Sequence, residues 1–171
     1  MTPALATQAR TLAVDVIVES PLWAGEPSAE QIVQRAIARA SESIDAPRAA
    51  DKELAVMLTD DASIRELNRH WRGIDKPTNV LSFPAAEPPG TSTPTHLGDI
   101  VIAYETAARE AKAEDKPLAH HLAHLAVHGF LHLLGYDHES EPEAETMEQL
   151  ERAILARLGV PDPYLTHDIG A

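Results

Sequence analysis

The stretch HGFLHLLGYDH, residues 128–138, places three histidines around a glycine near the end of a predicted helix. This helix is expected to begin at Pro117 and to run to about Leu134. His128 and His132 are one helical turn apart, so their imidazoles lie on one face, with Cβ atoms about 5–6 Å apart. Two side chains at that spacing can bind one tetrahedral zinc ion.

The third histidine, His138, depends on a turn in the chain. A continuing helix would carry it about 9 Å further along the axis. Gly135 lies where a C-terminal glycine would end the helix and turn the chain back. His124 is in line with the first two histidines, but about 12 Å of helix rise separate it from His132. We therefore predict one zinc ion bound by His128, His132 and His138, with His124 in the core or beside a ligand.

Three neutral protein ligands leave a fourth position for water, which is typical of catalytic zinc. The ion is expected to acidify that water toward a pKa of about 7, so the sequence predicts a hydrolase. The histidine spacing equals that of the zinc peptidase pattern HExxHxxGxxH, glycine included. The glutamate that serves those peptidases as general base is replaced here by Gly129, which can neither take nor give a proton. A peptidase-like hydrolase is kept only as an alternative.

Length and composition favour one globular domain. The chain has 171 residues; residues 1–10 are interpreted as a loose N-terminal extension and residues 11–171 as a single zinc-dependent hydrolase domain. The absence of cysteine excludes disulfides and cysteine-rich zinc sites, and it fits a reducing cytoplasm. No apolar run approaches the roughly 20 residues that span a membrane. The net charge of −13 argues against a broad nucleic-acid-binding surface.

The pattern of apolar residues predicts an α+β fold with a small mixed four-stranded sheet packed by about five helices. Strands and helices mix without strict alternation. The predicted strands cover residues 11–19, 53–59, 79–83 and 99–103, and the predicted helices cover residues 28–44, about 61–71, 106–114, 117–134 and 141–158.

The histidine stretch resembles the signature of the YbeY endoribonucleases, the bacterial rRNA maturation factors. Three further blocks agree: LNRHWRGIDKPTNVLSFP (residues 67–84), LGDIVIA (residues 97–103) and LGVPDPYL (residues 158–165). The resemblance implies zinc-dependent, single-strand-specific RNA cleavage at the 3′ end of 16S ribosomal RNA and a role in ribosome quality control. It implies that His128, His132 and His138 are the zinc ligands and that Arg72 is the family's essential arginine.

The chemistry of phosphodiester cleavage agrees with a role for Arg72. The transition state gains negative charge, and a guanidinium fork suits two phosphate oxygens. An ion pair with Asp75 is the alternative for this arginine. Arg65, Arg69 and Lys76 are possible contacts to the RNA backbone; the alternative is that they form a solvated face.

Other roles stay open from the sequence. Trp71 is interpreted as a core or half-buried residue, with base stacking as the alternative. The acidic stretch 137–151 is interpreted as a solvated helix face directed away from RNA. Asp137 is either a turn residue or a group that orients His138 or accepts a proton. The attacking group is either water or the RNA 2′-hydroxyl. A ribosome-associated factor with a structural zinc ion remains a third hypothesis.

Overall fold

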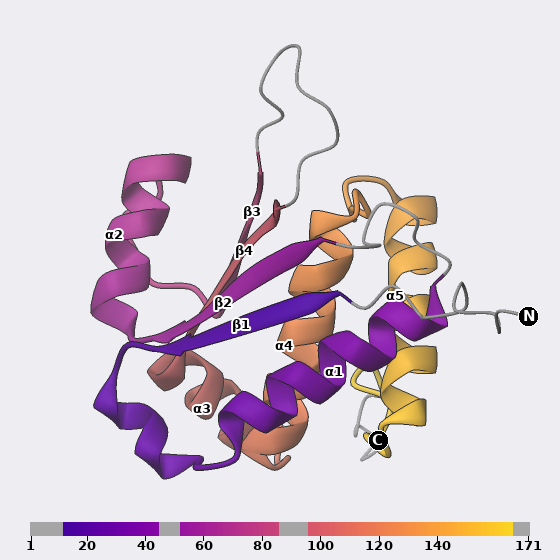
Figure 1. The fold of residues 1–171 in the computed structure, drawn as a ribbon, viewed down its shortest axis with the longest axis horizontal. Coiled ribbons are helices and arrows are strands. Elements are labelled where there is room, and N and C mark those ends of the chain that lie inside the picture. The colour runs from indigo at the N-terminus through magenta and orange to yellow at the C-terminus, as the bar shows by residue number, and fades with distance from the viewer. Residues whose placement is uncertain (1–11, 45–51, 86–95, 166–171) are drawn as a thin grey trace, which may run out of the picture.

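Four strands form one mixed sheet in the order β1-β2-β4-β3 (Figure 1). The computed structural model describes residues 12–44, 52–85 and 96–165 of the chain, so the predicted extension at residues 1–10 lies outside the described ranges. β1 is parallel to β2 and β2 to β4, whereas β3 is antiparallel to β4. The strands are β1 (Ala13–Val18), β2 (Glu53–Thr59), β3 (Val80–Pro84) and β4 (His96–Ala103).

Five α-helices accompany the sheet in the described ranges, so the predicted α+β architecture is confirmed. None of these helices combines the length and apolar character needed to cross a membrane. A 3-10 helix, η2, was not predicted; the Ser20 hydroxyl accepts a hydrogen bond from its first turn. The helices are η2 (Pro21–Gly25), α1 (Ala29–Ser43), α2 (Asp61–Arg72), α3 (Tyr104–Ala113), α4 (Leu118–Leu133) and α5 (Glu141–Arg157).

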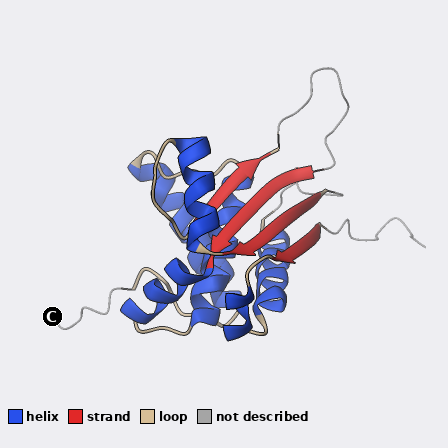
Figure 2. Ribbon diagram, turned by 90° about the vertical axis from the view of Figure 1, so that its left-hand side faces the viewer, coloured by secondary structure: helices blue, strands red, loops and turns tan. Residues whose placement is uncertain are grey.

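Alternating side chains of the sheet face two different helical layers. Ile100 and Ile102 of β4 belong to the main core, which also takes the apolar faces of α1, α4 and α5. Val101, between them, joins a smaller core with Ile64 of α2. The helices α2 and α4 therefore lie on opposite faces of β3 and β4 (Figure 1). Figure 2 shows the four strands as one twisted sheet.

β4 begins at His96, three residues before the predicted start at Asp99. The apolar run that marks the strand starts only at Ile100, so the pattern missed its first residues. Gly98 extends the strand by pairing with Pro84 of β3, and the register with β2 shifts just before this point. The edge strand β3 is thereby held along its whole length.

Gly98 provides a test of how tightly β3, β4 and α4 are packed. Its φ is +152°, and a Cβ there would lie 2.5 Å from the Phe83 carbonyl oxygen and 2.7 Å from Leu133 Cδ2. We expect Gly98→Ala to lower the free energy of unfolding by about 3 kcal/mol, measured by urea denaturation. Gly159→Ala is the control, because its φ is +77° but nothing lies within 4 Å. Equal losses in the two variants would contradict the crowding at Gly98.

Candidate metal centre

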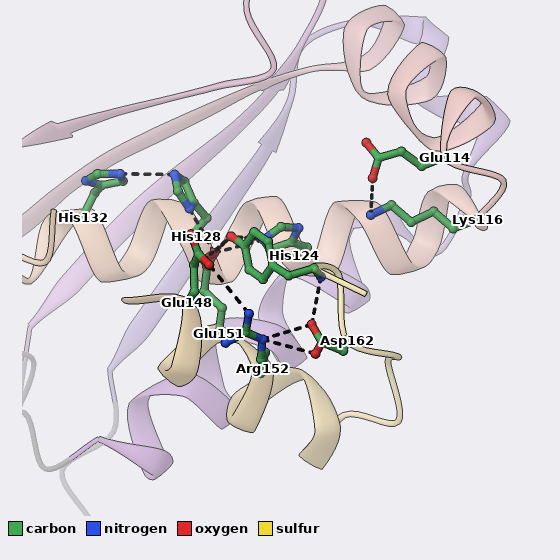
Figure 3. Close-up of polar contacts among 10 residues, drawn as sticks. Glu114, Lys116, His124, His128, His132, Glu148, Glu151, Arg152 and Asp162 are labelled. Carbon is green, nitrogen blue, oxygen red and sulfur yellow. Dashed lines mark hydrogen bonds and ion pairs between the residues drawn. The ribbon is translucent and has the colours of Figure 1, made fainter. Parts of the chain in front are cut away.

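The first two histidines face each other along one side of α4. The Nε2 atoms of His128 and His132 lie 3.2 Å apart, and the ring centroids are separated by 4.6 Å. Figure 3 shows His128 between His132 on one side and Glu151 on the other. The one-turn spacing read from the sequence therefore produces a close pair of ring nitrogens.

The predicted turn at Gly135 is present and brings in the third histidine. Gly135 has a φ of +100°, and its N–H donates to the His132 carbonyl at 3.0 Å. The Tyr136 N–H donates to the Leu131 carbonyl at 3.1 Å, which completes a helix C-cap. The chain then returns, so that the ring of His138 lies 5.1 Å from that of His132 between centroids.

These three side chains fit a zinc ion. Their ligand atoms all lie within 4.8 Å of one another. Two nitrogens on one tetrahedral zinc, each about 2.0–2.1 Å from the ion, are about 3.3 Å apart, close to the separation of the His128 and His132 pair. Burial, followed by repulsion from His128 and His138, lowers the pKa of His132 and favours the neutral ring that a metal requires. The side chain of His138 is 55% exposed, so the site is open on that side.

A buried carboxylate that the sequence did not single out supports the histidines. Glu151 of α5 is fully buried, and its Oε2 lies 3.0 Å from His128 Nδ1 and 2.9 Å from His124 Nε2. The Tyr164 hydroxyl donates a short hydrogen bond to the other oxygen of the same carboxylate. Figure 3 shows Glu151 below α4, beside His124 and His128 of that helix. We call Glu151, His124 and Tyr164 the support cluster.

The support cluster fixes which nitrogen of His128 is free. Burial alone would raise the pKa of Glu151, but hydrogen bonds from His124 and His128 outweigh burial and lower the pKa to about 2. An ionised carboxylate only accepts hydrogen bonds, so Nδ1 of His128 carries the proton. The lone pair then lies on Nε2, which faces His132. Carboxylates orient metal-binding histidines in this way in many zinc proteins.

The interpretation of residues 137–151 as a solvated face is wrong at Glu151. Together with Met147, Ile154 and Leu155, it lies on the buried side of α5. The positions 147, 151, 154 and 155 follow helical spacing, so the pattern contained a signal for a buried acid. The prediction that His124 lies in the core or beside a ligand agrees with its contact to Glu151.

Gly129 occupies the place of the peptidase glutamate and faces the sheet. A Cβ there would lie 2.9 Å from Ile100 Cγ2 and 3.2 Å from Ser82 Oγ. The Ser82 hydroxyl donates to the Gly129 carbonyl at 3.1 Å. A longer side chain at this position would be driven into β3 and β4, away from the histidines. The helix therefore has no room there for the peptidase general base.

Arg72 is the exposed last residue of α2 and makes no hydrogen bond or ion pair within the described ranges. Asp75, its predicted alternative partner, is taken by Arg65 at 2.8 and 3.2 Å. Arg69 pairs with Glu66 at 2.8 Å. Two of the three arginines of α2 are thus paired with acids, and Arg72 is left available.

Lys76 is also exposed, and its ammonium contacts no acid in the part of the chain that the structure describes. Its carbonyl accepts a hydrogen bond from Asn68 at 2.9 Å, which holds the loop after α2 against that helix. Helices α2 and α4 both contact the edge strand β3, through Trp71 with Phe83 and through Gly129 with Ser82. The basic end of α2 and the histidine helix therefore flank the same edge strand.

Asp137 stabilises the turn that carries the third histidine. Its Oδ1 accepts a hydrogen bond from the His138 N–H at 2.7 Å and lies 3.6 Å from His138 Nδ1. This geometry agrees with a turn residue and with a group that orients His138, while a role of Asp137 as proton acceptor stays a prediction.

Comparisons with known proteins identify one family. The sequence profile described as "Endoribonuclease YbeY" matches residues 22–159. Two curated proteins with that name, from Rhodopseudomonas palustris strain BisA53 and Bradyrhizobium sp. strain BTAi1, are each 62% identical to this chain; they cover 91% and 88% of it, and the matches span 92% and 90% of those proteins. A solution structure of a Thermotoga maritima protein is 25% identical, covers 85% of this chain and 91% of its own, and gives a TM-score of 0.47.

The support cluster can be tested through metal affinity. We expect Glu151→Gln to weaken zinc binding by about 10- to 100-fold, measured by competition with a chromophoric chelator. Glutamine cannot supply the negative charge that holds both histidine protons. Tyr164→Phe, which removes one hydrogen bond, is expected to have a smaller effect in the same direction. Glu145→Gln is the matched control on α5, because Glu145 is exposed and, within the described residues, its side chain accepts one hydrogen bond, from Gln149 at 3.4 Å. Unchanged affinity in folded Glu151→Gln protein would contradict the assignment.

Proposed function

Since the chain belongs to the endoribonuclease YbeY family, we propose that it is a zinc-dependent endoribonuclease that cleaves single-stranded RNA. The observation that carries the zinc dependence is the convergence of His128, His132 and His138, with their ligand atoms within 4.8 Å. A zinc ion bound there would supply positive charge to a phosphate whose negative charge grows in the transition state.

Within this proposal, each residue has a distinct task. His128, His132 and His138 hold the ion, and Glu151 keeps His128 in the protonation state that leaves Nε2 free. Arg72 is the catalytic arginine, and its guanidinium binds two oxygens of the phosphate that is cleaved. Its freedom from Asp75 supports this task, because a paired guanidinium would first have to break an ion pair. Either water or the 2′-hydroxyl is the attacking group.

We further propose that the substrate is ribosomal RNA, at the 3′ end of the 16S molecule, in the cytoplasm. The chain would then act on the small ribosomal subunit during its maturation and quality control. The support for this part is the resemblance of the four motif blocks to the family. We propose that Arg65, Arg69 and Lys76 contact the RNA backbone. Of these, Lys76 can bind a phosphate without breaking an ion pair, because the two arginines have acidic partners.

The role of Arg72 can be measured directly. We expect Arg72→Ala to lower kcat for cleavage of a labelled, unstructured RNA by about 10²- to 10³-fold, the usual cost of removing one transition-state donor. Arg35→Ala, at an exposed site on α1, is the control that removes the same charge on the other side of the sheet. If Arg72→Ala protein cleaves as fast as the control, the catalytic assignment is wrong.

The metal can be tested by removal and by mutation. We expect chelated protein to lose RNA cleavage and to recover it with added zinc, and His132→Ala to lose both zinc and cleavage. Cleavage that survives in zinc-free His132→Ala protein would contradict the zinc dependence, and zinc-loaded protein that cleaves no RNA would favour a ribosome-associated factor with a structural ion. A casein assay on the same preparations tests the peptidase alternative, and the placement of Gly129 leads us to expect no digestion.

A further inference from the structure

Trp71 is the most exposed of the large apolar side chains in the described ranges, at 65%. The interpretation of this residue as a core or half-buried side chain is therefore wrong. The interpretation rested on helical spacing, because Trp71 follows Ile64 and Leu67 on one side of the helix. In the structure, the part of α2 that packs on the smaller core ends before the last turn of the helix. An indole that is mostly exposed contributes little to the core, and it leaves an aromatic face free for a ligand.

The indole of Trp71 contacts two aromatic rings and is otherwise exposed to solvent. The ring of His70 meets it edge-on at 4.9 Å between centroids, with an interplanar angle of 87°. Phe83 of β3 lies 6.2 Å away at 56°. Neither ring is stacked flat on the indole. These contacts restrict its orientation and leave most of its surface to solvent, as a platform for a planar ligand requires.

The surroundings of Trp71 carry positive charge in an acidic protein. Between residues 65 and 76 there are four basic residues against two acids, a local balance of +2 in a chain of net charge −13. Arg65 and Arg69 pair with the two acids, which leaves Arg72 and Lys76 as the uncompensated charges. They outweigh the partial negative charge of about half a unit at the end of α2.

We propose that Trp71 stacks on an unpaired nucleobase of the RNA substrate, with Arg72 and Lys76 binding the phosphates on either side. An aromatic platform between unpaired cations suits a single strand, whose bases offer free faces and whose backbone is anionic. An apolar protein surface would match the indole but leave both cations without a partner. The inference deepens the proposed function and rests on it, since the ligand is the RNA cleaved at the histidines.

The position of Trp71 connects the platform with the histidines. Phe83, which touches the indole, and Ser82, which bonds Gly129, are neighbours on the edge strand β3 with side chains on opposite faces. A strand of RNA that passes around this edge reaches both the platform and the candidate metal centre. Bases in a duplex are already stacked on each other, so the platform would select single strands before any chemistry takes place.

The test measures binding separately from cleavage. The full-length protein is titrated with a 2′-O-methyl oligouridylate of about eight nucleotides, and the integrity of the probe is checked on a gel. Trp71 is one of only two tryptophans, and the other, Trp23, is 2% exposed with its indole N–H bonded to the Thr59 carbonyl. We expect the probe to quench the exposed indole, and Trp71→Ala to weaken binding by roughly 10-fold, with Trp71→Phe intermediate.

Two controls isolate the base from the charge. An abasic oligonucleotide of the same length keeps the phosphates, and we expect it to bind wild-type protein and Trp71→Ala protein equally. Ile17→Ala removes an exposed apolar side chain at the opposite edge, on β1, and should bind like wild type. If Trp71→Ala binds the oligouridylate as tightly as wild type does, the stacking role is overturned, and the indole is left as a surface for a protein.

Cleavage assays keep this outcome distinct from failure of the proposed function. We expect Trp71→Ala to raise KM with little change in kcat, whereas Arg72→Ala lowers kcat. If cleavage requires Arg72 and His132 but does not change in Trp71→Ala protein, the stacking role of Trp71 is wrong and the proposed nuclease function is retained. If RNA binding depends on Trp71 but the protein cleaves no RNA, the stacking role is retained and the proposed nuclease function is wrong.

Discussion

The close approach of α4 to the sheet at Gly129 is the contact on which the rest of the arrangement depends. Without a side chain there, the helix backbone comes near enough for its carbonyl to accept a hydrogen bond from Ser82 of β3. This contact fixes the rotation of α4 about its axis. With Gly129 against the sheet, His128 and His132 turn away from it, toward α5 and the open side. Gly129 thus determines the direction in which the side chains of His128 and His132 point.

The same rotation brings α4 against α5, where the carboxylate of Glu151 contacts His128 inside an otherwise apolar interface. A buried carboxylate is costly unless its oxygens are satisfied, and Glu151 accepts hydrogen bonds from two histidines and a tyrosine. Burial and this hydrogen bond also raise the pKa of the Tyr164 hydroxyl, which therefore remains a donor. The site then has a rigid inner side at Glu151 and an exposed outer side at His138, with access left to a large substrate.

Local patterns in the sequence predicted much of this structure. The four strands and five helices follow from the spacing of apolar residues, and β2 has the predicted bounds. The turn at Gly135 followed from the ligand spacing, because His138 could not otherwise join the pair. The burial of Glu151 and the exposure of Trp71 were missed for a physical reason. Whether an acid or an indole is buried depends on which helix lies opposite, and that is fixed by tertiary packing rather than by neighbours in the chain.

The support cluster also gives the histidine site an order of assembly. During synthesis, His128, His132 and His138 leave the ribosome before Glu151 and Tyr164, because the chain is made from its N-terminus. Until α5 and the segment after it have docked, His128 lacks the carboxylate that fixes its proton. The histidine site is therefore incomplete while α5 is still being translated. A newly made chain would then gain its activity only after those last supporting residues have emerged and folded.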